Sequence, residues 1–192
     1  ISELRQWLVS RKNIDPYFVK VRTLLGDALE KNLDEKDPGT AHRQLFRDLV
    51  FATAWQESCF RQFIVKDRKL TFIRSYNNTS VGMMQINERV WRGIYDIQHL
   101  RWDVAYNVAA GIEILERYLS RYALGRGEAA NALGPEELAG CVYAMYNGGP
   151  SQFQKYLHRL KTGNFYAIDR HFRQKYQWVK NKQWQRLHDC LF

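Results

Sequence analysis

The amino-acid sequence predicts a mainly α-helical fold with a small β lobe near the middle of the chain. Apolar residues recur at the spacing of one helix face through most of the sequence. Runs typical of β-strands occur only between residues 69 and 86, on either side of a polar turn. At 192 residues with 45% hydrophobic side chains, the chain is long enough to bury a core of its own.

The first helix is expected to begin at Asp15-Pro16, because a capping aspartate followed by proline is a common helix start. One apolar stripe then follows at helical spacing: Phe18, Val21, Leu25, Ala28 and Leu29. The segment from Lys36 to Thr40 breaks this helix with aspartate, proline and glycine. We therefore expect residues 1–40 to form a helical appendage on a second unit, residues 41–192.

The next helix, residues 41–58, carries a carboxylate on its apolar face. Its stripe consists of Leu45, Phe46, Leu49, Val50 and Thr53. At ~100° per residue, Glu57 falls on this same face, one turn beyond the stripe. Such a carboxylate must be paired, solvated in a cleft or held protonated. Pairing with a cation such as Arg61 is the structural alternative to a catalytic role.

The remaining elements follow in order. Two short β-compatible runs, residues 70–73 and 81–86, suggest a hairpin or an irregular β lobe. Helical spacing returns over residues 103–122, where small residues permit close helix packing, and a loop is expected over 121–133. Another helix should start after Gly134-Pro135 and stop at Gly148-Gly149-Pro150. Two amphipathic helices are expected near 151–160 and 165–187.

The net charge of +9 and the pI near 9.5 predict attraction to an anionic partner. The basic residues are spread along the chain without a nucleic-acid-binding signature, so we expect a solvated basic surface and no specific nucleic acid. No apolar run of roughly 18 residues is present. The chain opens at Ile1, as expected of a mature form or an excised domain, so the lack of a visible signal peptide says little about localisation.

The cysteines and histidines show no metal-binding spacing, so no metal and no other cofactor is expected. Cys59, Cys141 and Cys190 allow at most one intrachain disulfide, and the sequence leaves the pair open. Cys59 lies two residues after Glu57, but no partner base can be named for it as a nucleophile. It is better interpreted as a small buried residue or as half of a disulfide.

Glu57 has no assignable carboxylate partner in the sequence. Glycoside cleavage needs an acid that is still protonated near neutral pH, which partial burial of a glutamate provides. Ordinary glycosidases add a second carboxylate. The sequence does not define the geometry around the nearest acids along the chain, so none can be assigned as the second carboxylate. These acids are Asp67, Glu88, Asp96 and Asp103.

Three segments read in order indicate a family. Gln56-Glu57-Ser58 ends the apolar helix, Gly82-Met83-Met84-Gln85-Ile86 follows, and Tyr146-Asn147-Gly148-Gly149-Pro150 ends a later helix. Asn107 and Gly111 lie between them in an Asn-x-x-x-Gly pattern. Over residues 41–160 this order resembles the soluble lytic transglycosylase domain, a lysozyme-like domain related to goose-type lysozyme. The resemblance implies a lysozyme-like helical fold with extra N-terminal and C-terminal helices.

The resemblance also implies an activity and a site. Such enzymes cleave the β-1,4 bond between N-acetylmuramic acid and N-acetylglucosamine in peptidoglycan glycan strands, within the periplasm or cell envelope. Glu57 would act first as acid and then as base while a 1,6-anhydro ring closes without water. Gln85 would line the cleft, and Tyr146 would hold or polarise Glu57. Further substrate-binding residues are expected to be Ser58, Ser75, Met84 and Asn147, with Ser75 in an insertion between Glu57 and Gln85.

Several alternatives stay open on the sequence alone. A goose-type hydrolase would use water and would need Asp67 or Asp96 across the cleft from Glu57. An inactive wall-binding module would keep the scaffold without the chemistry. Tyr76 and Trp91 are candidate cleft aromatics, while Met83 is expected in the core. Exo- or endo-action, oligomeric state, and association with a membrane or wall machinery through regions outside the catalytic core are left undetermined.

Overall fold

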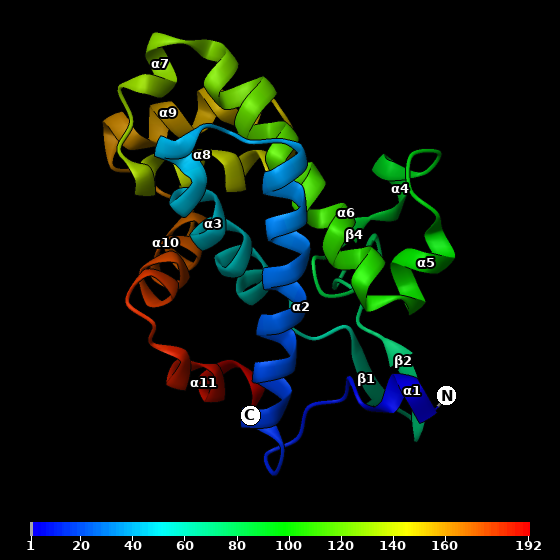
Figure 1. The fold of residues 1–192 in the computed structure, drawn as a ribbon. Helices are drawn as coiled ribbons and strands as arrows, with labels where there is room; N and C mark the ends of the chain where they lie inside the picture. The colour runs from blue at the N-terminus through cyan, green and yellow to red at the C-terminus, as the bar shows by residue number, and fades with distance from the viewer. Residues whose placement is uncertain (1) are drawn as a thin grey trace.

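The computed structural model describes residues 2–192 and is built mostly of helices (Figure 1). The short α1 (Ser2–Arg5) precedes the long α2 (Ile14–Glu35) and α3 (Thr40–Ser58). α2 begins one residue before the expected Asp15, and the break at residues 36–39 separates it from α3. The predicted fold class, mainly α with a small β lobe, is confirmed.

The β lobe contains two small antiparallel pairs, and its hairpin joins other strands than the two expected runs. β1 (Phe63–Lys66) pairs with β2 (Lys69–Phe72), and β3 (Ser80–Val81) pairs with β4 (Ile86–Asn87). The strand at 63–66 was not predicted. The expected run at 81–86 is strand only at its ends, because Gly82 (φ +78°) and Gln85 (φ +47°) turn the backbone between them.

The second half of the chain is helical with more interruptions than expected. α4 (Glu88–Trp91) and α5 (Ile97–Trp102) were not predicted; α6 (Val104–Arg117) and its π-helical extension η1 (Tyr118–Ala123) fill the expected helix. The expected loop at 121–133 is instead largely helical, with η2 (Leu124–Arg126) and α7 (Glu128–Asn131). The last elements follow in order: α8 (Pro135–Gly148), α9 (Gln152–Thr162), α10 (Ala167–Lys180), η3 (Trp184–Leu187) and α11 (His188–Leu191). The expected helix at 165–187 thus breaks at residues 181–183.

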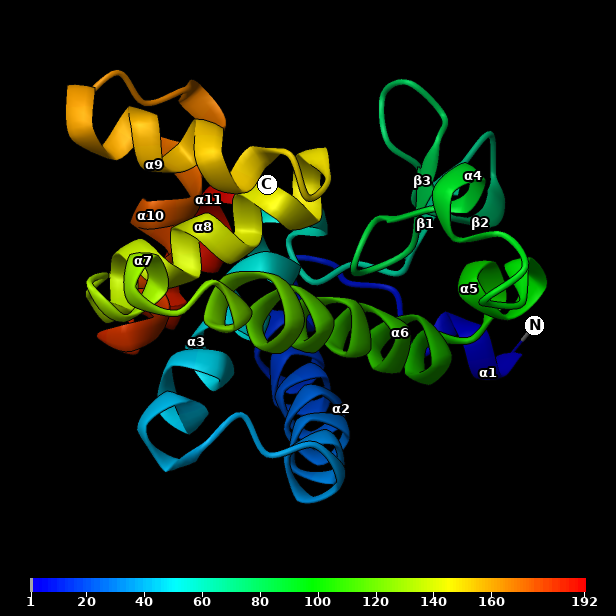
Figure 2. The ribbon, with the colours of Figure 1, turned by 90° about the horizontal axis from the view of Figure 1, so that it is seen from above.

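Two helices organise the molecule around its core. α3 packs against α10, α8 and α2, and its apolar stripe is fully buried. α6 connects the two ends of the domain: Figure 2 shows α4, α5 and the β lobe at one end, with α7 to α9 at the other. The buried side chains of α2 belong to the same hydrophobic core as those of α3 and α6. The boundary at residue 40 between an appendage and a second unit stays a prediction.

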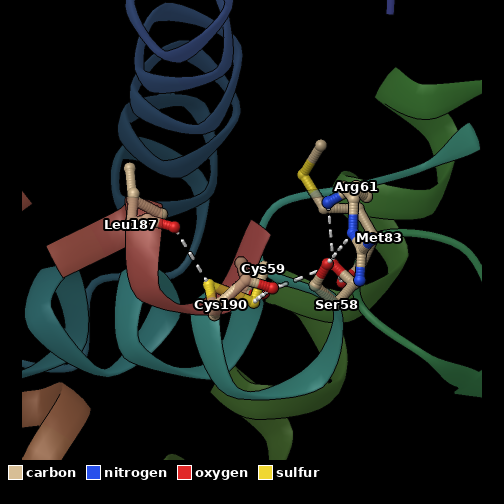
Figure 3. The surroundings of a disulfide bond; sticks show 7 residues. Ser58, Cys59, Arg61, Met83, Leu187 and Cys190 are labelled. Carbon is tan, nitrogen blue, oxygen red and sulfur yellow. Dashed lines mark hydrogen bonds between the residues drawn. A yellow bond between two sulfur atoms is a disulfide. The ribbon is translucent and has the colours of Figure 1, made fainter. Parts of the chain in front are cut away.

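A disulfide joins the end of α3 to the C-terminal helix. Cys59 and Cys190 are bonded across 131 residues of sequence (Figure 3), which answers the pairing question that the sequence left open. Cys59 lies in the left-handed region (φ 51°) directly after α3, so the cross-link is anchored two residues from Glu57. Cys141 is buried and unbonded on α8. None of the helices over residues 2–192 combines the length and the apolar character needed to cross a bilayer.

Candidate active site

Glu57 lies in the last turn of α3 and borders a small polar hollow of about 70 Å³. Its Oε1 accepts a hydrogen bond of 2.7 Å from the Tyr143 hydroxyl. The alternative pairing with Arg61 is wrong, because the Arg61 Nε donates to the Ser58 carbonyl oxygen instead. The hollow lies between α3, the β lobe and the end of α8, and it is lined by Glu57, Ser80, Gln85, Ile86, Asn87, Trp91, Ile114, Tyr146 and Asn147.

The residue that holds Glu57 was missed by the sequence analysis. Tyr143 is buried in α8 and stacks face to face on Phe172 of α10, with ring centroids 4.1 Å apart and an interplanar angle of 3°. Burial and the adjacent Glu57 carboxyl raise the pKa of Tyr143 well above its ordinary value, so the phenol stays a hydrogen-bond donor. Helical spacing was the available signal: Tyr143 lies three residues before Tyr146, on a shared face of α8.

Burial raises the pKa of Glu57 from its ordinary value of 4.5 to about 7. Removal from water disfavours the charged form of a carboxyl group, whereas the hydrogen bond from Tyr143 favours that form and limits the increase. A large fraction of the Glu57 carboxyl groups is therefore protonated at neutral pH. This is the state that a general acid requires.

The raised pKa predicts a pH-dependent effect of Glu57→Gln on stability. Between pH 4.5 and 7 the folded state keeps a proton that the unfolded chain loses, so the free energy of unfolding of the wild type falls as the pH rises through this window. Glutamine has no such proton. We expect the variant to be more stable than the wild type at pH 8, by at most about 3 kcal/mol, and equally stable at pH 4.

Urea unfolding at the two pH values measures this difference. Glu35→Gln, which changes an exposed acid at the end of α2, is the matched control and should show no comparable rise. Equal stability of wild type and Glu57→Gln at both pH values would contradict the raised pKa.

Two buried amide side chains hold the Gly82–Gln85 turn against the core. Gln62 Oε1 accepts from the Met83 backbone N–H at 2.7 Å, and Asn107 Oδ1 accepts from the Met84 backbone N–H at 2.9 Å. Both side chains are fully buried. Their NH₂ groups donate onward to the carbonyl oxygens of Val81, Leu100 and Arg101. The turn is therefore held from both α6 and the segment after α3.

Two glycines leave the space that this arrangement needs. A Cβ on Gly82 would lie 2.2 Å from Asn107 Nδ2, and its φ of +78° is a conformation that favours glycine. A Cβ on Gly111 of α6 would lie 2.5 Å from Met84 Cγ. The Asn-x-x-x-Gly pattern therefore serves the turn directly: its asparagine binds the backbone and its glycine makes room for Met84.

The structure brings together three of the expected substrate-binding residues. Gln85, Tyr146 and Asn147 all line the hollow beside Glu57. Gln85 Nε2 is bonded to the Gly82 carbonyl oxygen at 2.8 Å, which leaves its Oε1 for a ligand. The Tyr146 hydroxyl donates to the Met84 carbonyl oxygen at 2.6 Å, so the hydrogen bond that holds Glu57 comes from Tyr143 and not from Tyr146. Tyr146 thus links α8 to the turn, while Tyr143 contacts the acid.

The other expected residues lie outside the lining of the hollow. Met84 belongs to the turn and its side chain is fully buried, as is that of Met83. Ser58 is buried too, and its hydroxyl donates to the Met83 carbonyl oxygen at 2.6 Å (Figure 3). The Ser75 hydroxyl is used within its own loop, where it donates to Asn77 Oδ1 at 2.7 Å. Ser80 borders the hollow in its place. Of the two candidate aromatics, Trp91 borders the hollow, whereas Tyr76 is fully exposed on the loop that contains Ser75.

Glu57 is the one carboxylate among the described residues that line this hollow. The acids considered as partners lie outside this lining. Glu88 is bonded to Arg101, with 3.0 Å between Oε2 and Nη2. Asp67 is exposed in the β1–β2 turn, and Asp96 and Asp103 cap α5 and α6. No group of three or more potential metal-binding side chains occurs within residues 2–192.

Comparison with known proteins gives one result that bears on this site. Residues 39–168 match the family of the transglycosylase SLT domain, which covers more than half of the chain and contains all three segments of the sequence resemblance. Neither the curated proteins nor the solved structures yield a match. On the strength of the family match, the chain belongs to the transglycosylase SLT family of lysozyme-like lytic transglycosylases.

Proposed function

We propose that the protein is a peptidoglycan lytic transglycosylase in which Glu57 acts as both acid and base. The observation that carries this proposal is the isolated carboxyl group: Glu57 has a pKa of about 7, a single hydrogen bond from Tyr143, and no second carboxylate beside it in the described hollow. An acid without a carboxylate partner favours a reaction in which the substrate supplies its own nucleophile.

The proposed reaction proceeds in two proton transfers. Protonated Glu57 gives its proton to the glycosidic oxygen, and the bond from this oxygen to the muramoyl C1 breaks. The C6 hydroxyl of the same muramoyl sugar then attacks C1, and the Glu57 carboxylate takes the hydroxyl proton. A 1,6-anhydro ring forms, no water is consumed, and Glu57 is again protonated for the next cycle.

Neighbouring side chains support these steps. The Tyr143 hydroxyl stabilises the carboxylate that exists between the two transfers, because it donates a hydrogen bond to Oε1. The Gln85 Oε1 and the exposed Asn147 amide offer hydrogen-bond partners to the sugar substituents. Met84 and Ser58 act indirectly in this proposal, by holding the turn that presents Gln85.

Two further observations support a cell-envelope location. The Cys59–Cys190 disulfide is typical of an oxidising compartment such as the periplasm. The net charge of +9 favours approach to an acidic polymer. We therefore place the enzyme at the wall.

Analysis of the digestion products tests the proposed reaction. The protein is incubated with purified sacculi, and the released muropeptides are treated with borohydride and examined by mass spectrometry. We expect muropeptides that are one water lighter than the hydrolysis products and that resist reduction, as 1,6-anhydro ends do. Reducible muramic acid ends would instead identify a hydrolase of the goose-type lysozyme kind.

Tyr143→Phe should change the pH profile of cleavage as well as its rate. In the wild type, activity should fall above pH 7 as Glu57 loses its proton. The hydrogen bond from Tyr143 lowers the pKa of Glu57, so its loss should move the alkaline limb to higher pH. The rate at the optimum should drop about tenfold, because the carboxylate loses a charge-assisted hydrogen bond.

Initial rates of sacculus cleavage between pH 5 and 9 measure both effects. Tyr118→Phe, which changes a buried tyrosine outside the lining of the hollow, is the matched control. An unchanged rate with an unmoved alkaline limb would show that Tyr143 acts only through the packing of its ring against Phe172, which phenylalanine keeps.

A further inference from the structure

A second hollow, of about 190 Å³, adjoins the site on the side away from the β lobe. It lies between α8, α9 and the start of α10, and Asn147 borders both hollows. Tyr143 borders the second hollow while its hydroxyl contacts Glu57, which borders the first. The two spaces therefore flank the Tyr143–Glu57 hydrogen bond.

A buried ion pair forms one wall of the second hollow. Arg159 and Asp169 are 5% and 3% exposed, and they form two parallel bonds: Nε to Oδ2 at 2.7 Å and Nη2 to Oδ1 at 3.1 Å. Gln152 accepts a third bond from Arg159 Nη1 at 3.3 Å. Because the two charges cancel, the wall does not select an anionic ligand. Burial of such a pair is weak support for stability and suggests a positioning role.

The ion pair holds an exposed aromatic ring in place. Tyr166 is 57% exposed, yet its backbone N–H donates to Asp169 Oδ2 at 2.9 Å. The Arg159 guanidinium carbon lies 4.2 Å from the centroid of its ring. An exposed tyrosine ordinarily samples several rotamers, whereas this ring rests on a fixed cation. A fixed ring beside amide side chains presents an apolar surface and hydrogen-bond groups together, which suits the apolar and polar faces of a sugar.

We propose that this second hollow binds saccharide units of the glycan strand beyond the scissile bond, with Tyr166 as the ring on which a sugar stacks. Arg159 and Asp169 are positioning residues for Tyr166, and Gln152 and Asn147 bond the sugar substituents. This inference rests on the proposed function, because the strand must cross Glu57 to reach both hollows. It predicts that Tyr166 matters only for strands long enough to reach it.

Binding of peptide-free oligomers of N-acetylglucosamine to the Glu57→Gln protein tests the inference. Calorimetry compares the Glu57→Gln parent with the same protein carrying Tyr166→Ala as well, for oligomers of increasing length. Tyr166→Ala should leave the affinity for the shortest binding oligomers unchanged and should weaken the affinity for long oligomers about tenfold. Tyr166→Phe keeps the ring and should bind like the parent. Phe192→Ala is the control, because it removes an exposed ring from a separate pocket formed by the N-terminal and C-terminal segments. It should leave the affinity unchanged for oligomers of any length.

Equal affinity of Tyr166→Ala and its parent at every length would overturn the inference, as would an equal loss at every length. Thermal unfolding of each variant checks that its fold is intact. Failure of the proposed function has a different signature, because the wild type would then release reducible ends from sacculi whether or not Tyr166 affects binding.

Discussion

Glu57→Gln is expected to lower the rate of glycan cleavage about a thousandfold while the fold stays intact. Glutamine has nearly the same shape as glutamic acid and can still accept the hydrogen bond from Tyr143. It can neither donate a proton to the glycosidic oxygen nor take one from the C6 hydroxyl. General acid–base catalysis contributes about 10² to 10⁴ in rate, and here one group performs both transfers.

Release of soluble muropeptides from sacculi measures this loss, with circular dichroism as the check on folding. Glu35→Gln changes the charge by the same amount on the exposed end of α2 and should keep the wild-type rate. A Glu57→Gln protein that cleaves sacculi within tenfold of the wild type would show that another group supplies the proton.

Asn107→Leu should produce the largest loss of stability among the substitutions considered. Asn107 is fully buried in α6 and bonds the Met84 N–H, the Val81 carbonyl and the Leu100 carbonyl at 2.9, 3.0 and 2.9 Å. Leucine of similar size would leave the buried Met84 N–H without a partner and would remove the bonds to the Val81 and Leu100 carbonyls, while Gln62 still serves Leu100. The orphaned N–H costs about 1–3 kcal/mol and each of the two lost bonds to carbonyl oxygens about 1 kcal/mol, so we expect a loss of about 4 kcal/mol in the free energy of unfolding.

Denaturant unfolding gives the size of this loss, and amide hydrogen exchange gives its location. Exchange at Met84 should accelerate more than exchange within α3, because the turn loses its support first. Asn131→Leu, at an exposed position in α7, is the matched control and should stay within about 0.5 kcal/mol of the wild type. A loss below about 1 kcal/mol for Asn107→Leu would mean that the turn is held by other contacts.

The sequence was sufficient to single out Glu57 as the candidate acid and to predict the helix that carries it. Glu57 could be recognised because helical spacing defines which face of α3 is buried, and a carboxylate on that face needs an explanation. The stop after α8 was equally clear, since Gly148-Gly149-Pro150 prevents the helix from continuing. Local signals of this kind depend only on neighbouring residues.

The contacts around the acid could not be predicted in the same way. Tyr143 and Tyr146 both lie on α8, and which hydroxyl reaches Glu57 depends on how α8 packs against α3. Gln62 lies in no recognisable motif, and it binds the Met83 backbone from 21 positions away. Pairing of Cys59 with Cys190 likewise depends on where the C-terminal helix folds back.

The backbone of the β lobe also could not be predicted from the sequence. Residues 81–86 have the composition of a strand, but Gly82 and Gln85 adopt positive φ and form a turn held by Gln62 and Asn107. Tertiary contacts here override the local preference for extended backbone. Ser75 was expected in the site because of its position in the insertion, and instead it organises the loop that brings Ser80 to the hollow.

Digestion of sacculi in water enriched in the heavy oxygen isotope tests the central claim most directly, that Glu57 closes the ring without water. Mass spectrometry then determines whether each newly formed muramoyl end carries the label. The proposed mechanism predicts anhydro ends without heavy oxygen, because the C6 hydroxyl of the substrate supplies the attacking atom. One heavy oxygen at C1 of each new end would contradict the account and show that water is the nucleophile.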